Sequence, residues 1–118
     1  MTTLTDTLAT IAATHAGRAL DARQKLADYV ADTTGTTALD LTPHLHRVIT
    51  DETTAKVYTD TLGMLTHGAT TDTARHYLTG LVLQSPGDTW SGRTNDAERV
   101  KADAIRTAVR DLLHTLAD

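Results

Sequence analysis

The chain has 118 residues, a formal net charge of -4 at pH 7 and no cysteine. The length suits one compact core, so we expect residues 1–118 to form a single domain, and the lack of cysteine excludes disulfides and thiolate metal sites. The acidic balance argues against a nucleic-acid partner, because phosphate binding needs clustered Lys and Arg. Without a signal peptide pattern or a run of ~20 apolar residues, we expect a cytoplasmic protein that does not contact membranes.

The first predicted helix covers about residues 3 to 32. Its apolar stripe follows intervals of three and four residues and contains Leu4, Leu8, Ile11, His15, Ala19, Ala22, Leu26 and Tyr29. Unbroken, this helix would be ~45 Å long, whereas a compact domain of this size is ~35 Å across. We therefore expect a break or kink at Gly17. The alternative is an overhanging helix that buries its end against a second copy, which would make the protein a homodimer through its first helix.

Residues 33–41 are rich in turn-forming types and should connect two helices. Thr42 is expected as the N-cap of the next helix, with Pro43 at the first helical position, where its missing N–H costs nothing. One apolar stripe then continues to Gly68. Its phase slips near residues 50–54, so this region could form one helix or two.

The third predicted helix begins near Thr70, Thr71 and Asp72, which are N-cap candidates, and ends before Ser85. Gly80 lies inside it and weakens a helix by about 1 kcal/mol relative to Ala. We therefore expect Gly80 where a neighbouring helix approaches closely.

The last predicted helix begins with Asn95 as its N-cap. Its expected buried side consists of Ala97, Val100, Ala104, Ile105, Ala108, Val109, Leu112 and Leu116. Alternating apolar and polar runs are almost absent, so no sheet is expected. The sequence thus predicts an all-α, single-domain bundle of four to six helices, packed closely because alanine is abundant.

The titratable residues do not form a metal-binding or catalytic pattern. His44 and His46 are two residues apart, a spacing that points them to nearly opposite sides of a helix. Glu52 and Glu98 are too few to assemble the acidic runs of helical Mg²⁺-dependent nucleotide hydrolases. We expect no catalytic residue, metal or cofactor, and interpret His15 as a polar group on the apolar stripe.

Two other functions remain as alternatives. A helix-turn-helix at residues 72–84 would make the protein a DNA-binding transcriptional regulator, although its second half is too short and apolar to contact bases. A small-ligand-binding or hydrolytic domain would need a pocket near Arg93, His76 and Tyr77.

Residues 85–106 concentrate residue types that are rare elsewhere, including the only tryptophan, Trp90. Residues 85–88 are typical of a turn, and Trp90 is interpreted first as a plug for the end of the bundle. Trp and Arg are also enriched where binding energy concentrates in protein interfaces. The candidate partner-binding residues are Trp90, Arg93, Asp96, Arg99, Asp103, Arg106 and Arg110. The last four form one polar stripe, which is equally typical of a solvated helix face.

The run W-x-G-R-x-N-D at residues 90–96, followed by Arg99 and Asp103, resembles a run in small uncharacterised proteins of phages that infect GC-rich actinobacteria. Ala104 stands where that group has glycine after the helix Asp. The chain's richness in Ala, Thr, Arg, Asp and Leu agrees with GC-rich codons, but the resemblance implies no activity. We expect a small, soluble, non-enzymatic accessory protein that binds an unidentified protein through this surface or through the first helix.

Overall fold

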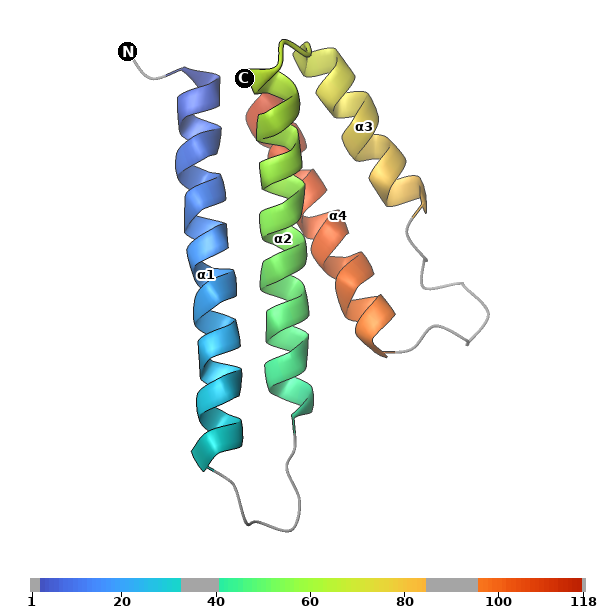
Figure 1. Cartoon of the computed structure of the whole chain (residues 1–118). Helices are drawn as coiled ribbons and strands as arrows, with labels where there is room; N and C mark the ends of the chain where they lie inside the picture. Colours follow the sequence, from blue (N-terminus) through green and yellow to red (C-terminus); the bar gives the residue numbers. More distant parts are fainter. Residues whose placement is uncertain (1–2, 33–40, 85–95, 118) are drawn as a thin grey trace.

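The computed structural model describes residues 3–32, 41–84 and 96–117, and these residues form helices without any strand (Figure 1). The helices are α1 (Leu4–Asp32), α2 (Thr42–Thr66), α3 (Thr71–Gln84) and α4 (Asp96–Leu116). α1 and α2 lie side by side and antiparallel, α4 crosses behind α2, and α3 packs mainly against α4 (Figure 1). The all-α prediction is confirmed for the described residues, and their four helices lie within the predicted range.

α1 is one continuous helix through Gly17, so the predicted break is wrong. Its start is capped reciprocally: Thr3 Oγ1 accepts the Asp6 N–H at 3.0 Å, and Asp6 Oδ2 accepts the Thr3 N–H at 3.3 Å. A helix this long does not fit a sphere of this mass, and the chain is correspondingly flat, with extents of 53 × 39 × 19 Å. Packing along α2 outweighs the small helix penalty of a single glycine.

α2 is also continuous, so residues 50–54 do not divide it into two helices. The slip in its apolar stripe arises because α2 packs against α1 on one side and α4 on another, which superimposes two stripes. Thr42 is the first helical residue and Leu41 is the N-cap, so Thr42 is not the cap that was predicted. The segment after the helix turns at Gly68, whose φ of 95° only glycine adopts readily.

Several threonines bond back into their own helix. Thr61 is fully buried, and its hydroxyl donates to the Val57 carbonyl at 2.8 Å, which satisfies it. The same i to i−4 bond is made by the hydroxyls of Thr7, Thr10, Thr14, Thr66 and Thr115. These side chains therefore fit into helices despite their modest helix propensity.

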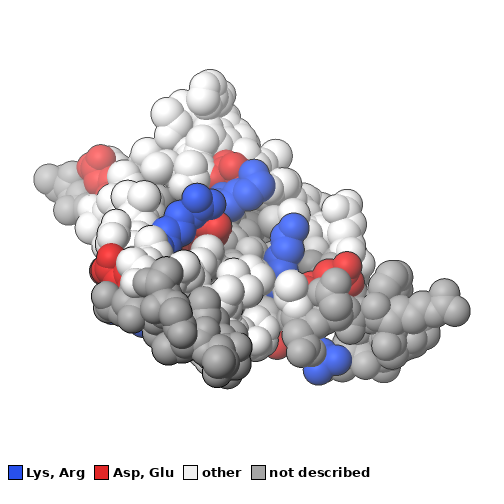
Figure 2. Space-filling model, turned by 60° about the horizontal axis from the view of Figure 1, so that its bottom comes forward, with Lys and Arg blue, Asp and Glu red and all other residues white. Residues whose placement is uncertain are grey.

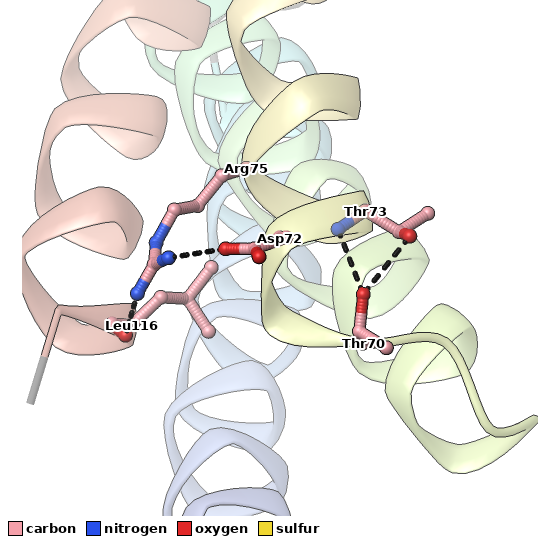
Figure 3. Close-up of polar contacts among 5 residues, drawn as sticks. All are labelled: Thr70, Asp72, Thr73, Arg75 and Leu116. Atoms are coloured by element: carbon pink, nitrogen blue, oxygen red, sulfur yellow. Dashed lines mark hydrogen bonds and ion pairs between the residues drawn. The ribbon is translucent and has the colours of Figure 1, made fainter.

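The predicted start of α3 is confirmed, since Thr70 Oγ1 accepts the Thr73 N–H at 3.1 Å (Figure 3). The close helix approach predicted at Gly80 is wrong, because a Cβ there would meet no atom within 4 Å. Asn95 and the turn at residues 85–88 lie outside the described residues. Ala97, predicted to be buried, is exposed in the first turn of α4.

The apolar core lies where the first half of α1, the second halves of α2 and α4, and α3 meet (Figure 1). We call this region the four-helix end. Its buried residues are Leu8, Ala12, Val57, Tyr58, Ala74, Leu78, Ala108, Val109, Leu112 and Leu116. The remaining parts of α1 and α2, residues 17–32 and 42–54, form what we call the helical extension.

Arg75 ties α3 to the C-terminal end of α4 in the four-helix end (Figure 3). Its Nη2 donates to the Leu116 carbonyl at 2.8 Å, and its Nη1 donates to Asp72 Oδ1 at 2.7 Å. The guanidinium thus satisfies a helix-terminal carbonyl and places a positive charge at the negative end of the α4 dipole.

Candidate protein-binding surfaces

The polar stripe predicted on the last helix is only partly described. Trp90 and Arg93 lie outside the described residues, and Asp96 is described only as the first backbone position of α4. Arg99 is exposed on this helix. The plug hypothesis and the partner-binding hypothesis for Trp90 therefore both stay predictions.

The rest of the stripe consists of local ion pairs. Arg106 Nη1 lies 2.7 Å from Asp103 Oδ1, and Arg110 Nε lies 3.4 Å from Asp111 Oδ1. The first pair has the i,i+3 spacing of an ordinary solvated helix face, and the second joins adjacent residues of the same helix. A shallow groove of about 250 Å³ runs beside the stripe between α2 and α4, and it is lined by Thr50, Thr54, Val100, Asp103, Ala104 and Thr107.

Cations and anions alternate over the described surface. Figure 2 shows Lys and Arg side chains next to Asp and Glu, rather than gathered in one basic patch. Along the helical extension, Asp21 Oδ2 lies 3.1 Å from Lys25 Nζ and 3.9 Å from Arg47 Nη2, and Arg47 Nε lies 3.7 Å from Asp51 Oδ2. Such pairing leaves little unbalanced positive charge to follow a phosphate backbone.

His15 stacks on Tyr58 where α1 meets α2, with ring centroids 4.6 Å apart. Burial lowers the pKa of His15, and the nearby Arg18 lowers it further, whereas Asp51 and Asp111 act in the opposite direction. Burial also raises the pKa of Tyr58. The contact fits the interpretation of His15 as a packed polar group, because a half-buried ring stacked on an aromatic neighbour is held mainly by packing.

The pocket that a ligand-binding or hydrolytic domain would need was predicted near Arg93, His76 and Tyr77. Arg93 lies outside the described residues, His76 is exposed, and the Tyr77 hydroxyl donates to Asp60 Oδ2 at 3.4 Å. Described grooves lie between α1 and α2, between α2 and α4, and along the end of α4, and neither His76 nor Tyr77 lines any of these three. Among the described side chains, no three His, Asp or Glu residues gather in a way that could hold a metal ion.

An apolar groove between α1 and α2 was not predicted from the sequence. It has a volume of about 380 Å³ and is lined by Ala16, Ala19, Leu20, Arg23, Glu52 and Ala55. Leu20 is 71% exposed although it is a large apolar residue. The one ion pair at this groove joins Arg23 Nε to Glu52 Oε2, so its two charges cancel.

The same face continues along both helices in both directions. Positions seven apart lie on one side of a helix, so Val30 follows Arg23 on α1 and Leu45 precedes Glu52 on α2. Val30 and Leu45 are 39% and 44% exposed. On α1 the exposed residues Ala9, Ala13, Ala16, Leu20 and Ala27 share this side. We call the surface formed by the groove and these residues the hairpin face.

The sequence contains a weak signal for this face. Steps of four, three, four and seven residues connect Ala9, Ala13, Ala16, Leu20 and Ala27, which is a second stripe beside the one that packs on α2. Alanine contributes little to apolar patterns, so the stripe shows only once Leu20 is seen to be exposed. Three of the four exposed large apolar side chains among the described residues lie on α1 and α2.

No family model, curated protein or solved structure matches the chain. The resemblance of residues 90–96, Arg99 and Asp103 to small phage proteins therefore stays a prediction. Within the described ranges, no helix is both long enough and apolar enough to cross a lipid bilayer.

Proposed function

We propose that the chain is a small helical protein-binding protein, an accessory or adaptor without a catalytic role, and that the hairpin face is its contact surface. The carrying observation is the exposure of Leu20, Val30 and Leu45 along one side of the α1–α2 pair. Contiguous exposed apolar surface is uncommon on soluble monomers and marks binding sites when polar groups border it. The resemblance to phage proteins adds a phage accessory role to this proposal.

Small side chains make this face suited to a helical partner. Ala16, Ala19 and Ala55 form the floor of the groove, so a second helix can approach closely and bury apolar atoms along its length. Apolar atoms dominate the groove, whereas the polar stripe on α4 already satisfies its charges locally through Asp103 and Asp111. The apolar face therefore offers more binding free energy than the stripe.

The proposal is tested by placing a photo-crosslinking residue at position 20 or at position 83 in cells that carry the gene. Leu83 is a matched control, since it is 80% exposed but lies on α3. We expect covalent protein adducts from position 20 and few from position 83. Equal yields from both positions would exclude the hairpin face as the contact.

A second arm tests the surface predicted from the sequence. Affinity purification with the Trp90→Ala, Arg93→Ala double variant should recover the same partners as the wild type if the hairpin face is the contact. Loss of those partners, with helicity unchanged by circular dichroism, would move the contact to the segment before α4. If position 20 captures no protein and neither the wild type nor the double variant recovers a partner, the protein-binding function itself is wrong.

A further inference from the structure

We infer that the hairpin face pairs two copies of this chain around a two-fold axis that passes beside Leu20. This inference rests on the proposed function, and it names the partner of the same surface. Three features of the face support a second copy over an unrelated helix: its shape, its symmetry along α1 and its charge.

The shape of the face is self-complementary. A two-fold contact uses one patch twice, so the patch must hold both a projection and the groove that receives it. Leu20 projects, at 71% exposure, and it borders the groove whose floor is Ala16, Ala19 and Ala55. With the axis beside Leu20, each leucine enters the groove of the other copy and both lose contact with water.

The stripe on α1 is nearly symmetric about Leu20. Ala13 and Ala27 lie seven residues to either side of it, and Ala9 and Ala31 lie eleven residues to either side. In an antiparallel pair of α1 helices, each of these alanines would face an alanine of the partner subunit, which allows a short distance between the helix axes.

The side chain of Arg23, which lies on the hairpin face, can also be accommodated in this dimer. Three residues to either side of Leu20 stand Gly17 and Arg23, so Gly17 faces Arg23 of the partner subunit in an antiparallel pair. The space around Gly17 is open, since an added Cβ would meet nothing within 4 Å. The aliphatic part of the arginine can lie across the glycine while its guanidinium stays bound to Glu52.

The charge of the face permits self-association in a protein that otherwise repels itself. The whole chain carries a formal charge of -4, but the groove holds one cation and one anion, Arg23 and Glu52, already paired. Because Arg23 faces Gly17 of the partner subunit, the two ion pairs lie on opposite sides of the axis and do not meet. The like charges of the groove are therefore not forced into contact, whereas contact between like charges would disfavour a wrong pairing.

The size of the face indicates a dimer of moderate strength. From Ala9 to Ala31 the helix spans ~33 Å at ~1.5 Å per residue, and two helices side by side are ~20 Å wide. About 650 Å² per copy would be covered, somewhat less than the ~800 Å² per partner of a standard interface. We therefore expect dissociation in the micromolar range.

The oligomeric state of the purified chain tests this inference. By sedimentation equilibrium, we expect the wild type to be dimeric at tens of micromolar, Leu20→Arg to weaken dimerisation by at least ~100-fold, and Leu83→Arg to leave it unchanged. A wild type that stays monomeric at ~200 µM, well above the expected dissociation constant, would overturn the inference. So would a dimer that Leu20→Arg leaves intact.

A crosslinking measurement tests the inferred dimer even if Leu20→Arg fails to fold. The chain has no cysteine, so Leu20→Cys and Leu83→Cys each introduce a single thiol. Mild oxidation should join two copies through position 20 much faster than through position 83, because the axis passes beside residue 20. Equal rates would contradict the two-fold arrangement. The purified chain could instead be monomeric while position 20 still captures another protein in cells. In that case the inferred dimer is wrong and the proposed protein-binding function stands.

Discussion

The four-helix end and the helical extension hold their helices together in different ways. At the four-helix end, Leu8, Leu78 and Leu112 are completely buried among all four helices. In the extension, the contact between α1 and α2 uses the small residues Ala19 and Ala22, and the ion pairs Arg23–Glu52 and Asp21–Arg47 join the two helices. The four-helix end buries its large apolar side chains inside the bundle. The extension brings two helices close together and leaves a larger apolar side chain, Leu20, on the outside.

The largest expected effect comes from the four-helix end. Leu112→Ala should lower the free energy of unfolding by about 2–5 kcal/mol, because it removes buried methyl groups and leaves a cavity. Urea denaturation followed by circular dichroism measures this loss. Leu83→Ala, at a side chain that is 80% exposed, is the control and should change stability by no more than about 0.5 kcal/mol. Equal losses would mean that the core does not lie where α1, α2, α3 and α4 meet.

The packing of the extension can be tested by enlarging it. Ala22 is 2% exposed, so Ala22→Leu should force α1 away from α2 and cost about 1–3 kcal/mol. Ala97→Leu makes the same change at an exposed position in α4 and should be close to neutral. Unfolding in urea compares the two variants. A neutral Ala22→Leu would show that the two helices of the extension are not in close contact.

A smaller effect is expected for the link between α3 and α4. Arg75→Gln loses the hydrogen bond to the Leu116 carbonyl and the ion pair with Asp72, at a cost of about 1 kcal/mol. Arg110→Gln removes an exposed arginine that pairs with its neighbour Asp111, and should cost at most about 0.5 kcal/mol. The midpoint of thermal unfolding should therefore be lower for Arg75→Gln than for Arg110→Gln. Equal midpoints would show that Arg75 does not stabilise the contact between α3 and α4.

The smallest effect concerns pH. Because burial lowers the pKa of His15 below its ordinary value of 6.5, the unfolded chain binds this proton more readily than the folded chain. The free energy of unfolding should therefore fall as the pH drops below 6.5. It should level off once the His15 imidazole is protonated in the folded state as well. Urea midpoints measured across this range should fall more steeply for the wild type than for His15→Gln. His114→Gln, at an exposed position on α4, should retain the wild-type slope.

Local signals predicted most of the fold. Apolar spacing and the cap at Thr70 gave the helices and several of their ends, because both depend on residues within a few positions of each other. The break at Gly17 was wrong because the decision depends on α2, which packs along α1 and outweighs the cost of a glycine. Whether residues 50–54 divide the second helix was left open for a related reason, since a helix with two neighbours carries two overlapping stripes.

The candidate surface was harder to predict than the fold. Whether Leu20 is buried or exposed depends on which side of α1 receives α2, and both sides of that helix carry small apolar residues. On the described part of the α4 stripe, Arg106 pairs with Asp103 and Arg110 with Asp111, and the partner-binding role of the stripe stays a prediction. The roles of Trp90 and Arg93 stay predictions.

The threonine hydroxyls that bond back to their own helices also affect how the exposed side of α1 meets water. A hydroxyl that donates to a carbonyl four residues earlier has no hydrogen left to donate to solvent, and what it presents outward includes its methyl group. Thr10 and Thr14 are exposed in this state in the first half of α1. The threonine content therefore overstates how strongly the protein is hydrated, and the surface along α1 is drier than the sequence suggests.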